Sequence, residues 1–166
     1  MPTSATVQTN QFHIPKRRIK VRIELLTGGT LTGSFYADQH NSSGGPGRVS
    51  DRLNNREEPF IPLAVEDRHI LVRKAVIATV QLENEPWETP QQSSNTSELR
   101  LRVKLTNGSS ARGKIVAVLP KERARVLDFL NCYDAEFLAL ISGENRITLV
   151  NSNHIESVTE FVEREP

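Results

Sequence analysis

The sequence contains a single cysteine, Cys132, and its four histidines lie far apart in the chain. A lone cysteine cannot form a disulfide within the chain, and histidines at such spacings match no common zinc-binding pattern. No phosphate-binding loop or dinucleotide fingerprint is present. These absences predict a protein without a metal, a cofactor or a catalytic centre, and therefore one that is not an enzyme. The histidines are His13, His40, His69 and His154.

An excess of charge of either sign is also lacking. The 21 basic residues nearly balance the 20 acidic ones, so no overall field draws the chain to nucleic acid or to an anionic membrane. There is no apolar run of membrane-spanning length and no signal-peptide core. We expect a protein of a reducing compartment, a cytoplasm of bacterial type, that does not insert into membranes and whose electrostatic preferences are local.

The chain does contain an internal repeat. The heptapeptide RVSDRLN at residues 48–54 returns 77 positions later as RVLDFLN at residues 125–131. Phe60 follows the first copy at the same spacing at which Phe137 follows the second. The repeated unit is therefore larger than a heptapeptide, and we expect one fold to be used twice.

Each copy of the repeat has the alternating pattern of half-buried β-strands. In the first copy, apolar residues alternate with charged ones, and a Thr-Gly-Gly turn leads into a second alternating segment, which predicts a hairpin. Further β-branched runs bring the prediction to about five strands for each copy. The alternating apolar residues of the first segment are Ile19, Val21, Ile23 and Leu25.

The repeat and the polar stretches around it predict how the chain is divided. Trp87 stands in a proline-containing linker, and its large apolar area favours a role in pinning the linker to a neighbouring domain. The predicted segments are a tail at 1–16, a first domain at 17–82, a linker at 83–97, a second domain at 98–162 and a tail at 163–166.

Both copies share glycines and a closing apolar run at fixed spacings. A turn glycine permits positive φ, and a second glycine five residues later lets a strand bend sharply as a sheet closes on itself. This pattern resembles that of Sm-like (LSm-type) domains, of a bacterial type with an Arg-x-x-Asp-x-Leu-Asn insert before the third strand. The residues that carry the resemblance are Leu25-Leu26-Thr27-Gly28, Gly33, Leu71, Val72, Ile77 and Val80 in the first copy, and Leu105-Thr106-Asn107-Gly108, Gly113, Leu149, Val150, Ile155 and Val158 in the second.

The resemblance implies a mainly β protein of two tandem five-stranded bent barrels, each with a short helical turn before the third strand. It also implies association of barrels edge to edge, because their outer strands leave backbone groups unpaired. A homo-oligomer or a subunit of a protein complex is therefore expected. Sm-like RNA binders place Arg-Gly or a similar pair in a late loop, whereas this chain has Arg73-Lys74-Ala75 and Asn151-Ser152-Asn153 there.

The repeated heptapeptide has two interpretations. Its arginine and aspartate lie three positions apart, so on one helical turn they face each other and can pair, while its asparagine suits a helix C-cap in left-handed geometry. In the first interpretation, which we favour, the turn covers one end of a barrel. In the second it is a ligand or subunit contact, one in each copy. The residues are Arg48, Asp51 and Asn54, with Arg125, Asp128 and Asn131.

A basic run at the start of the first domain is the candidate site for nucleic acid or another anion. Lys20 and Arg22 are predicted to share the outer face of the first strand with Arg18, which gives a stripe that can meet phosphates. A solvated strand face is the favoured interpretation, because few aromatic residues accompany the stripe. The full candidate set is Lys16, Arg17, Arg18, Lys20, Arg22, Arg73 and Lys74, with Lys121, Arg123 and Arg125 as further candidates.

Three functions are therefore carried forward. The first is a non-enzymatic interaction or scaffold module that acts through oligomerisation at barrel edges or through protein partners. The second is RNA binding through the basic stripe. The third is a sensor of cyclic dinucleotides, because Arg18-x-x-x-Arg22 resembles the opening of PilZ barrels, although proline at position 46 stands where their downstream motif has glycine.

Overall fold

The computed structural model describes residues 16–42, 44–85, 87, 95–119, 122 and 125–161. Ten antiparallel strands form one continuous sheet in this part of the chain, which confirms the prediction of a mainly β protein. The sheet order is β10-β6-β7-β8-β9-β5-β1-β2-β3-β4. Two short α-helices fall on the two copies of the repeated heptapeptide.

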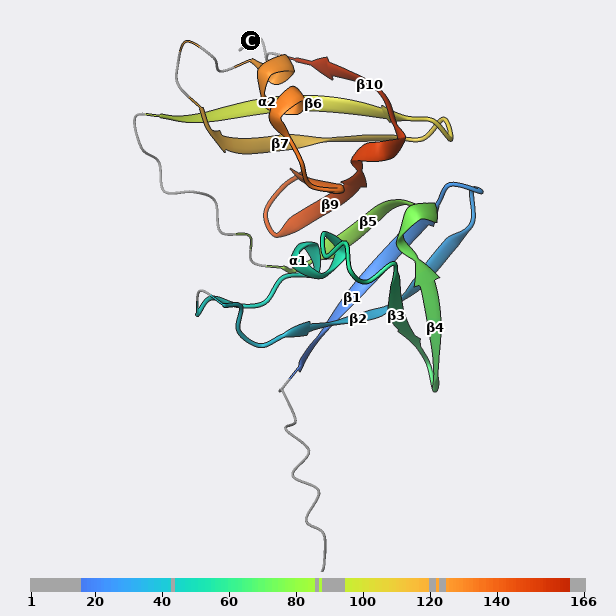
Figure 1. The fold of residues 1–166 in the computed structure, drawn as a ribbon. Helices are drawn as coiled ribbons and strands as arrows, with labels where there is room; N and C mark the ends of the chain where they lie inside the picture. Colours follow the sequence, from blue (N-terminus) through green and yellow to red (C-terminus); the bar gives the residue numbers. More distant parts are fainter. Residues whose placement is uncertain are drawn as a thin grey trace, which may run out of the picture.

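The strands divide into two halves of the same construction. The first half contains β1 (Lys16–Leu25), β2 (Thr30–Asp38), α1 (Val49–Leu53), β3 (Phe60–Val65), β4 (Arg68–Arg73), the 3₁₀ turn η1 (Lys74–Val76) and β5 (Ile77–Glu83). The second half contains β6 (Thr96–Leu105), β7 (Ser110–Val118), α2 (Val126–Cys132), β8 (Phe137–Ile141), β9 (Arg146–Asn151), η3 (Ser152–His154) and β10 (Ile155–Glu160). Figure 1 shows the second half above the first.

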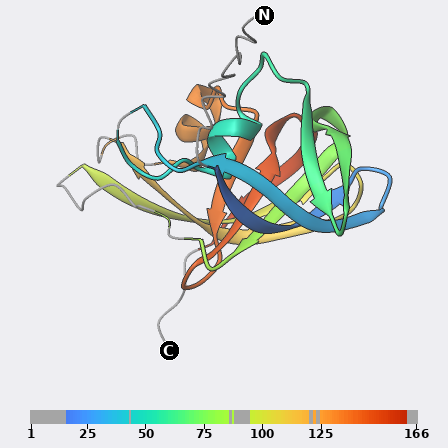
Figure 2. The same cartoon turned by 90° about the horizontal axis from the view of Figure 1, so that it is seen from below.

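The two halves are joined through the sheet itself. Within each half the fifth strand lies beside the first, giving the orders β5-β1-β2-β3-β4 and β10-β6-β7-β8-β9. The β5 strand of the first half then pairs with β9 of the second half. The strands are strongly curved when the molecule is seen from below (Figure 2). The sheet therefore ends at β4 on one side and at β10 on the other.

The glycines at equivalent positions of β2 and β7 are required by close packing. A Cβ atom on Gly33 would clash with the backbone oxygen of Ala64, and one on Gly113 would lie 2.8 Å from the Cβ of Leu140. Next to these glycines, β3 pairs with β2 at a single residue pair, Ser34 with Ala64, and β8 pairs with β7 at a single residue pair, Lys114 with Ile141. Any side chain here would push the crossing strand away, which is the physical reason for the repeated glycine.

Two clusters of buried apolar side chains form the interior, and the halves share them. The first cluster contains residues of β1 to β5, but it also contains Phe137, Ile147 and Leu149 from the second half. The second cluster contains residues of β6 to β9 and of α2, together with Ala78 from β5. Each half therefore completes its core with side chains from the other.

Candidate functional site

The β5–β9 junction is the contact through which the two halves bind each other. Five consecutive residues pair across it, with Val80 opposite Leu149 and Leu82 opposite Ile147. All four of these side chains are buried. Because backbone pairing and apolar burial act together here, the junction has the composition of a strand-addition interface between two domains.

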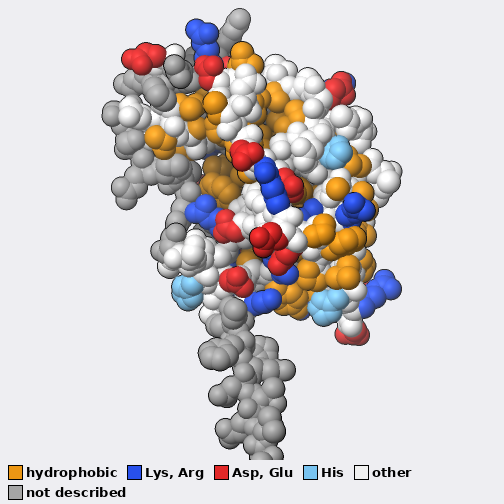
Figure 3. All heavy atoms as spheres, viewed as in Figure 1, with side chains coloured by type: hydrophobic (Ala, Val, Ile, Leu, Met, Phe, Trp, Pro, Cys, Tyr) orange, Lys and Arg blue, Asp and Glu red, His pale blue; other side chains and the backbone are white. Residues whose placement is uncertain are grey.

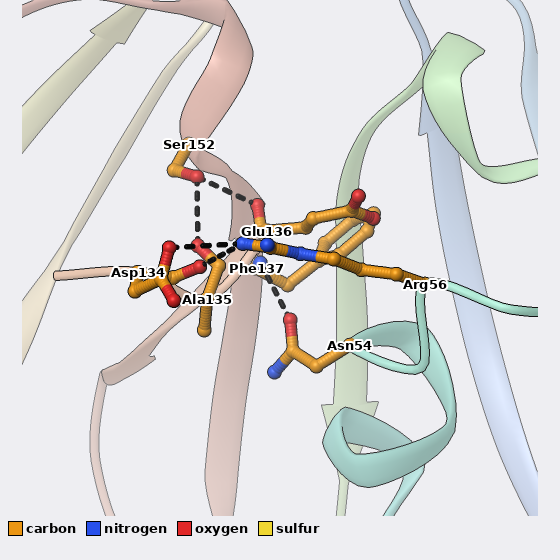
Figure 4. Close-up of polar contacts among 7 residues, drawn as sticks. All are labelled: Asn54, Arg56, Asp134, Ala135, Glu136, Phe137 and Ser152. Atoms are coloured by element: carbon orange, nitrogen blue, oxygen red, sulfur yellow. Dashed lines mark hydrogen bonds and ion pairs between the residues drawn. The ribbon is translucent and has the colours of Figure 1, made fainter.

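Side-chain hydrogen bonds close the junction at the ends of the strands. Asn54, at the end of α1, accepts a hydrogen bond from the backbone N–H of Phe137 at 2.8 Å, and Arg56 reaches Asp134 at 3.0 Å (Figure 4). In the buried interior, Nδ2 of Asn151 donates to the backbone oxygen of Ile77 at 2.9 Å. The repeated asparagine of the first copy is therefore a contact between the halves.

The predicted left-handed cap geometry of this asparagine is wrong. Asn54 is the C-cap of α1, but its φ of −83° and ψ of −4° lie in the right-handed region. Its equivalent Asn131 lies inside α2, which continues to Cys132. In this right-handed conformation the Asn54 amide oxygen accepts the hydrogen bond from the N–H of Phe137.

The predicted pairing of arginine and aspartate on one helical turn also requires correction. Arg48 and Arg125 are the N-caps of α1 and α2 and have extended backbone, with φ near −110° in both. Neither arginine therefore stands on the helical face of the aspartate. Asp51 instead accepts a hydrogen bond from the backbone N–H of Arg48 at 3.1 Å, and the Arg48 guanidinium lies 4.9 Å from the ring centroid of Trp87.

Trp87 fastens the start of the linker to the first half. Its half-buried ring packs against the first apolar cluster while Arg48 lies over its face. Nearby, the guanidinium of Arg17 contacts both carboxylate oxygens of the buried Glu85 and the backbone oxygen of Gly47. The linker is thus held at its beginning by an aromatic contact and an ion pair.

The outer side of β4 exposes residues whose equivalents are buried at the junction. Leu71 of β4 is 68% exposed, whereas Leu149, its equivalent in β9, is fully buried. Phe60 at the start of β3 is 48% exposed, whereas Phe137 is 1% exposed. Figure 3 shows hydrophobic side chains gathered over this side of the first half. The β4 edge therefore carries the apolar side chains of a junction that it does not form among the described residues.

The β10 edge shows the complementary difference. Leu130, Ile155 and Val158 are only partly buried against the second apolar cluster. Their equivalents in the first half are Leu53, Ile77 and Val80, which are completely buried beside β9. The second cluster is thus less completely covered at β10 than the first cluster is at β5.

We use the term free edges for the outer sides of β4 and β10, which have no strand neighbour among the described residues. Sequence reasoning missed their key residues, Phe60, Leu71, Leu130 and Val158. Each is apolar, as is its equivalent in the other copy. No signal in the sequence distinguishes a covered position from an uncovered one at these sites.

The basic stripe lies on the solvent face of β1, as predicted. Lys16, Arg18, Lys20 and Arg22 are all exposed and alternate with inward-facing residues. Arg17 lies on the other face and is bound to Glu85. Arg73 is exposed at the end of β4, and Arg125 is exposed before α2. Lys121 and Arg123 lie outside the described residues.

Lys74, a further candidate for anion binding, is buried. Its ammonium group donates to the backbone oxygens of Arg52 and Asn55 at 2.7 and 2.8 Å, at the C-terminal end of α1. Burial lowers the pKa of Lys74, although Glu58 and Glu136 oppose this shift. The Lys74 side chain therefore connects η1 to the C-terminal end of α1 through these two hydrogen bonds.

A hollow of about 690 Å³ lies beside α1 and contains charges of both signs. Lys16, Arg48 and Arg52 line it together with Asp38 and Asp51. This mixture favours no ligand class by its charge. At the position of Arg52 the second half has Phe129, so the lining is not repeated.

Comparison with protein-family models, curated proteins and solved structures found no match. Among the described residues, no helix has the length and apolar character needed to cross a membrane. The same residues contain no group of three or more metal-ligating side chains placed to hold an ion. The junction and the free edges are therefore the features of the described residues that bear on function.

Proposed function

We propose that this protein is a non-enzymatic scaffold module, built of two tandem Sm-like barrels, that associates with other polypeptide chains through its free edges. The observation that carries the proposal is the β5–β9 junction, in which one half of the chain already binds the other by strand addition. The same construction ends at β4 and β10 with backbone groups available for another strand.

The Sm-like interpretation of each half is supported by its strand order and by its glycines. Both halves place the fifth strand beside the first, and in both the second and third strands approach so closely at Gly33 and Gly113 that a Cβ atom would clash. A short helix precedes the third strand in each half. The glycines and the short helix before the third strand are features that the sequence resemblance implied.

The proposal is tested by size-exclusion chromatography with light scattering, at low and at high salt. We expect a mass that is a multiple of 18.6 kDa and that persists at high salt, because backbone pairing and apolar burial are weakly screened. The absorbance ratio at 260 and 280 nm should be that of protein alone. A monomer at every salt and protein concentration would contradict association through the free edges.

RNA binding is the second candidate function. It is favoured by the exposed stripe of Lys16, Arg18, Lys20 and Arg22 on one face of β1. Binding through such a stripe should weaken steeply with salt, because each neutralised phosphate releases counterions. A peak that carries nucleic acid at low salt and loses it at high salt would favour this function over the scaffold.

A further inference from the structure

A polar cleft of about 270 Å³ lies over the β5–β9 junction, and both halves of the chain line it. The first half contributes residues of β1 and β5, whereas the second half contributes residues of β7, of β9 and of the turn before β9. Ligand sites occur preferentially at such interfaces between domains. The side chains of this polar cleft therefore need to be compared with their equivalents elsewhere in the repeat.

The floor of the polar cleft carries hydroxyl groups that the repeat does not require. Thr148 of β9 is 8% exposed and lines the cleft, whereas its equivalent in β4 is Ile70, which packs against the first apolar cluster. Among the described residues, no hydrogen bond engages the Thr148 hydroxyl. Thr79 of β5, which is 3% exposed, is a second buried hydroxyl in the lining. A buried hydroxyl is unfavourable without a partner, so this floor suits a polar ligand.

Two arginines of the second half form the basic end of the polar cleft. Arg112 of β7 and Arg146 of β9 line it, and both lie at the turn that contains Ser142. Neither guanidinium has a hydrogen-bond or ion-pair partner among the described residues. Glu83 lies opposite Arg146 in the sheet, so this end has one carboxylate against two guanidiniums. Thr32 is the equivalent of Arg112, which shows that the pair of arginines is specific to the second half.

Glu24 of β1 forms the acidic end of the polar cleft. It pairs in the sheet with Thr79, and the distance along β5 from Thr79 to Glu83 is about 13 Å at the usual rise of a strand. The half-buried carboxylate of Glu24 accepts hydrogen bonds from Nδ2 of Asn107 at 3.2 Å and from the Thr79 hydroxyl at 3.5 Å. These contacts hold the carboxylate in place, and its remaining lone pairs can accept from a cation.

We propose that the polar cleft binds a small linear zwitterion, with its carboxylate at Arg112 and Arg146 and its ammonium group at Glu24. Guanidinium groups recognise carboxylates by paired hydrogen bonds, and the two buried threonine hydroxyls lie between the ends. The separation of the ends favours a ligand whose charges are several bonds apart, such as an ω-amino acid or lysine, over glycine. A volume of about 270 Å³ is below the roughly 300–1,000 Å³ of drug-sized ligand sites, which excludes a dinucleotide.

The zwitterion site is independent of the proposed association, because none of its lining residues belongs to β4 or β10. A ligand that contacts both walls of the polar cleft connects the first half to the second. Since it binds only when the two halves are folded against each other, it stabilises the folded chain by mass action. Binding should therefore raise the temperature of thermal unfolding.

Isothermal titration calorimetry of the full chain with ε-aminocaproate tests the site, and thermal unfolding with the same compound provides a second readout. Caproate and hexylamine are the matched probes, because each has a similar length but lacks one of the two charges. We expect saturable binding of one ε-aminocaproate molecule per chain. Each matched probe should bind about tenfold more weakly or less, because it loses the charge-assisted hydrogen bonds at one end.

Substitutions at the two ends locate the bound probe. Arg146→Gln and Glu24→Gln should each weaken the binding of ε-aminocaproate about tenfold. Arg68→Gln is the matched control, since Arg68 is the exposed equivalent of Arg146 at the start of β4 and lies outside the polar cleft. Its affinity should equal that of the wild type. Arg146 is exposed, so Arg146→Gln is expected to fold, which circular dichroism checks for every variant.

Each outcome has a distinct meaning. The absence of saturable binding of ε-aminocaproate at millimolar concentrations would overturn the site. If caproate binds as tightly as ε-aminocaproate, Glu24 takes no part and the zwitterion is overturned. If Arg68→Gln weakens binding as much as Arg146→Gln, the ligand is bound elsewhere and the assignment to the polar cleft fails. A chain that binds ε-aminocaproate but is always monomeric in light scattering would contradict the scaffold function and leave the site standing.

Discussion

Phe137 and Phe60 occupy the same position in the two halves of this molecule, yet Phe137 is buried in a core and Phe60 stands at the surface. The same contrast separates Leu149 from Leu71. The residue types are identical within each pair, but β9 has β5 as a second neighbouring strand, whereas β4 has only β3 beside it among the described residues. An apolar side chain in a repeated sheet protein can therefore belong to a core that its own half does not complete.

The largest expected effect concerns these two phenylalanines. Phe137→Ala should lower the free energy of unfolding by about 3–5 kcal/mol, because it leaves a cavity in the first core. Phe60→Ala should change it by less than about 0.5 kcal/mol in the monomeric chain. Urea unfolding at a low protein concentration measures both values. Equal losses in the two variants would contradict the assignment of one covered and one uncovered position.

Lys74 provides the next contrast, since the same position in the second half is Ser152. The backbone N–H of Lys74 donates to the oxygen of Pro59, and the backbone N–H of Ser152 donates to the equivalent oxygen of Glu136. Only the lysine side chain also donates hydrogen bonds to backbone oxygens at the end of α1. Lys74→Met should cost about 1–3 kcal/mol, because it removes the two hydrogen bonds that the ammonium group donates to backbone oxygens. Lys20→Met, the same change on the exposed face of β1, should cost less than about 0.5 kcal/mol.

The cost of Lys74→Met should also depend on pH. Burial lowers the pKa of Lys74 below its ordinary value of 10.5, so the folded state binds this proton less tightly than the unfolded state does. Wild-type stability therefore rises as pH increases from the folded pKa toward 10.5, and the variant lacks this gain. In thermal unfolding, the difference in stability between the wild type and Lys74→Met should widen as pH rises through the alkaline range. A difference that narrows would mean that folding raises the pKa of Lys74 and does not lower it.

The repeated asparagines should give a smaller effect. Asn54→Ala removes the acceptor for the N–H of Phe137 and should lower stability by about 1 kcal/mol. Asn131→Ala should leave the monomer unchanged within about 0.5 kcal/mol, because Asn131 is exposed. Chemical denaturation of the two variants compares them directly. A loss at Asn131 equal to that at Asn54 would mean that the helix terminus, and not the contact between halves, explains the repeated residue.

The smallest effect is expected at Arg56, whose ion pair with Asp134 spans the halves at the surface. The side chains are 61% and 94% exposed, and such pairs contribute little because water and salt screen them. Arg56→Ala should cost no more than about 0.5 kcal/mol in low salt, and less at high salt. A large, salt-independent loss would show that the junction depends on this contact more than on its buried residues.

Much of the fold could be predicted because it depends on local patterns. Alternation of apolar and charged residues at Ile19, Val21 and Ile23 predicted a strand whose inner face is buried. The turn glycines Gly28 and Gly108 do have positive φ, at 89° and 87°. The geometry of the candidate site was harder to predict from the sequence. The geometry of Arg48, Asp51 and Asn54 was predicted from a helical turn, whereas the arginine stands before the helix and the asparagine contacts the other half.

The order of residues alone indicates that one unit is used twice, where its strands lie and which faces of those strands are apolar. These properties follow from residue spacing, because a strand has a period of two and a sharp bend needs glycine. The pairing of β5 with β9, and the position of β4 and β10 at the ends of the sheet, are seen only in the folded chain. Backbone pairing groups are the same in every strand, so the choice among edges depends on how the two halves meet in space.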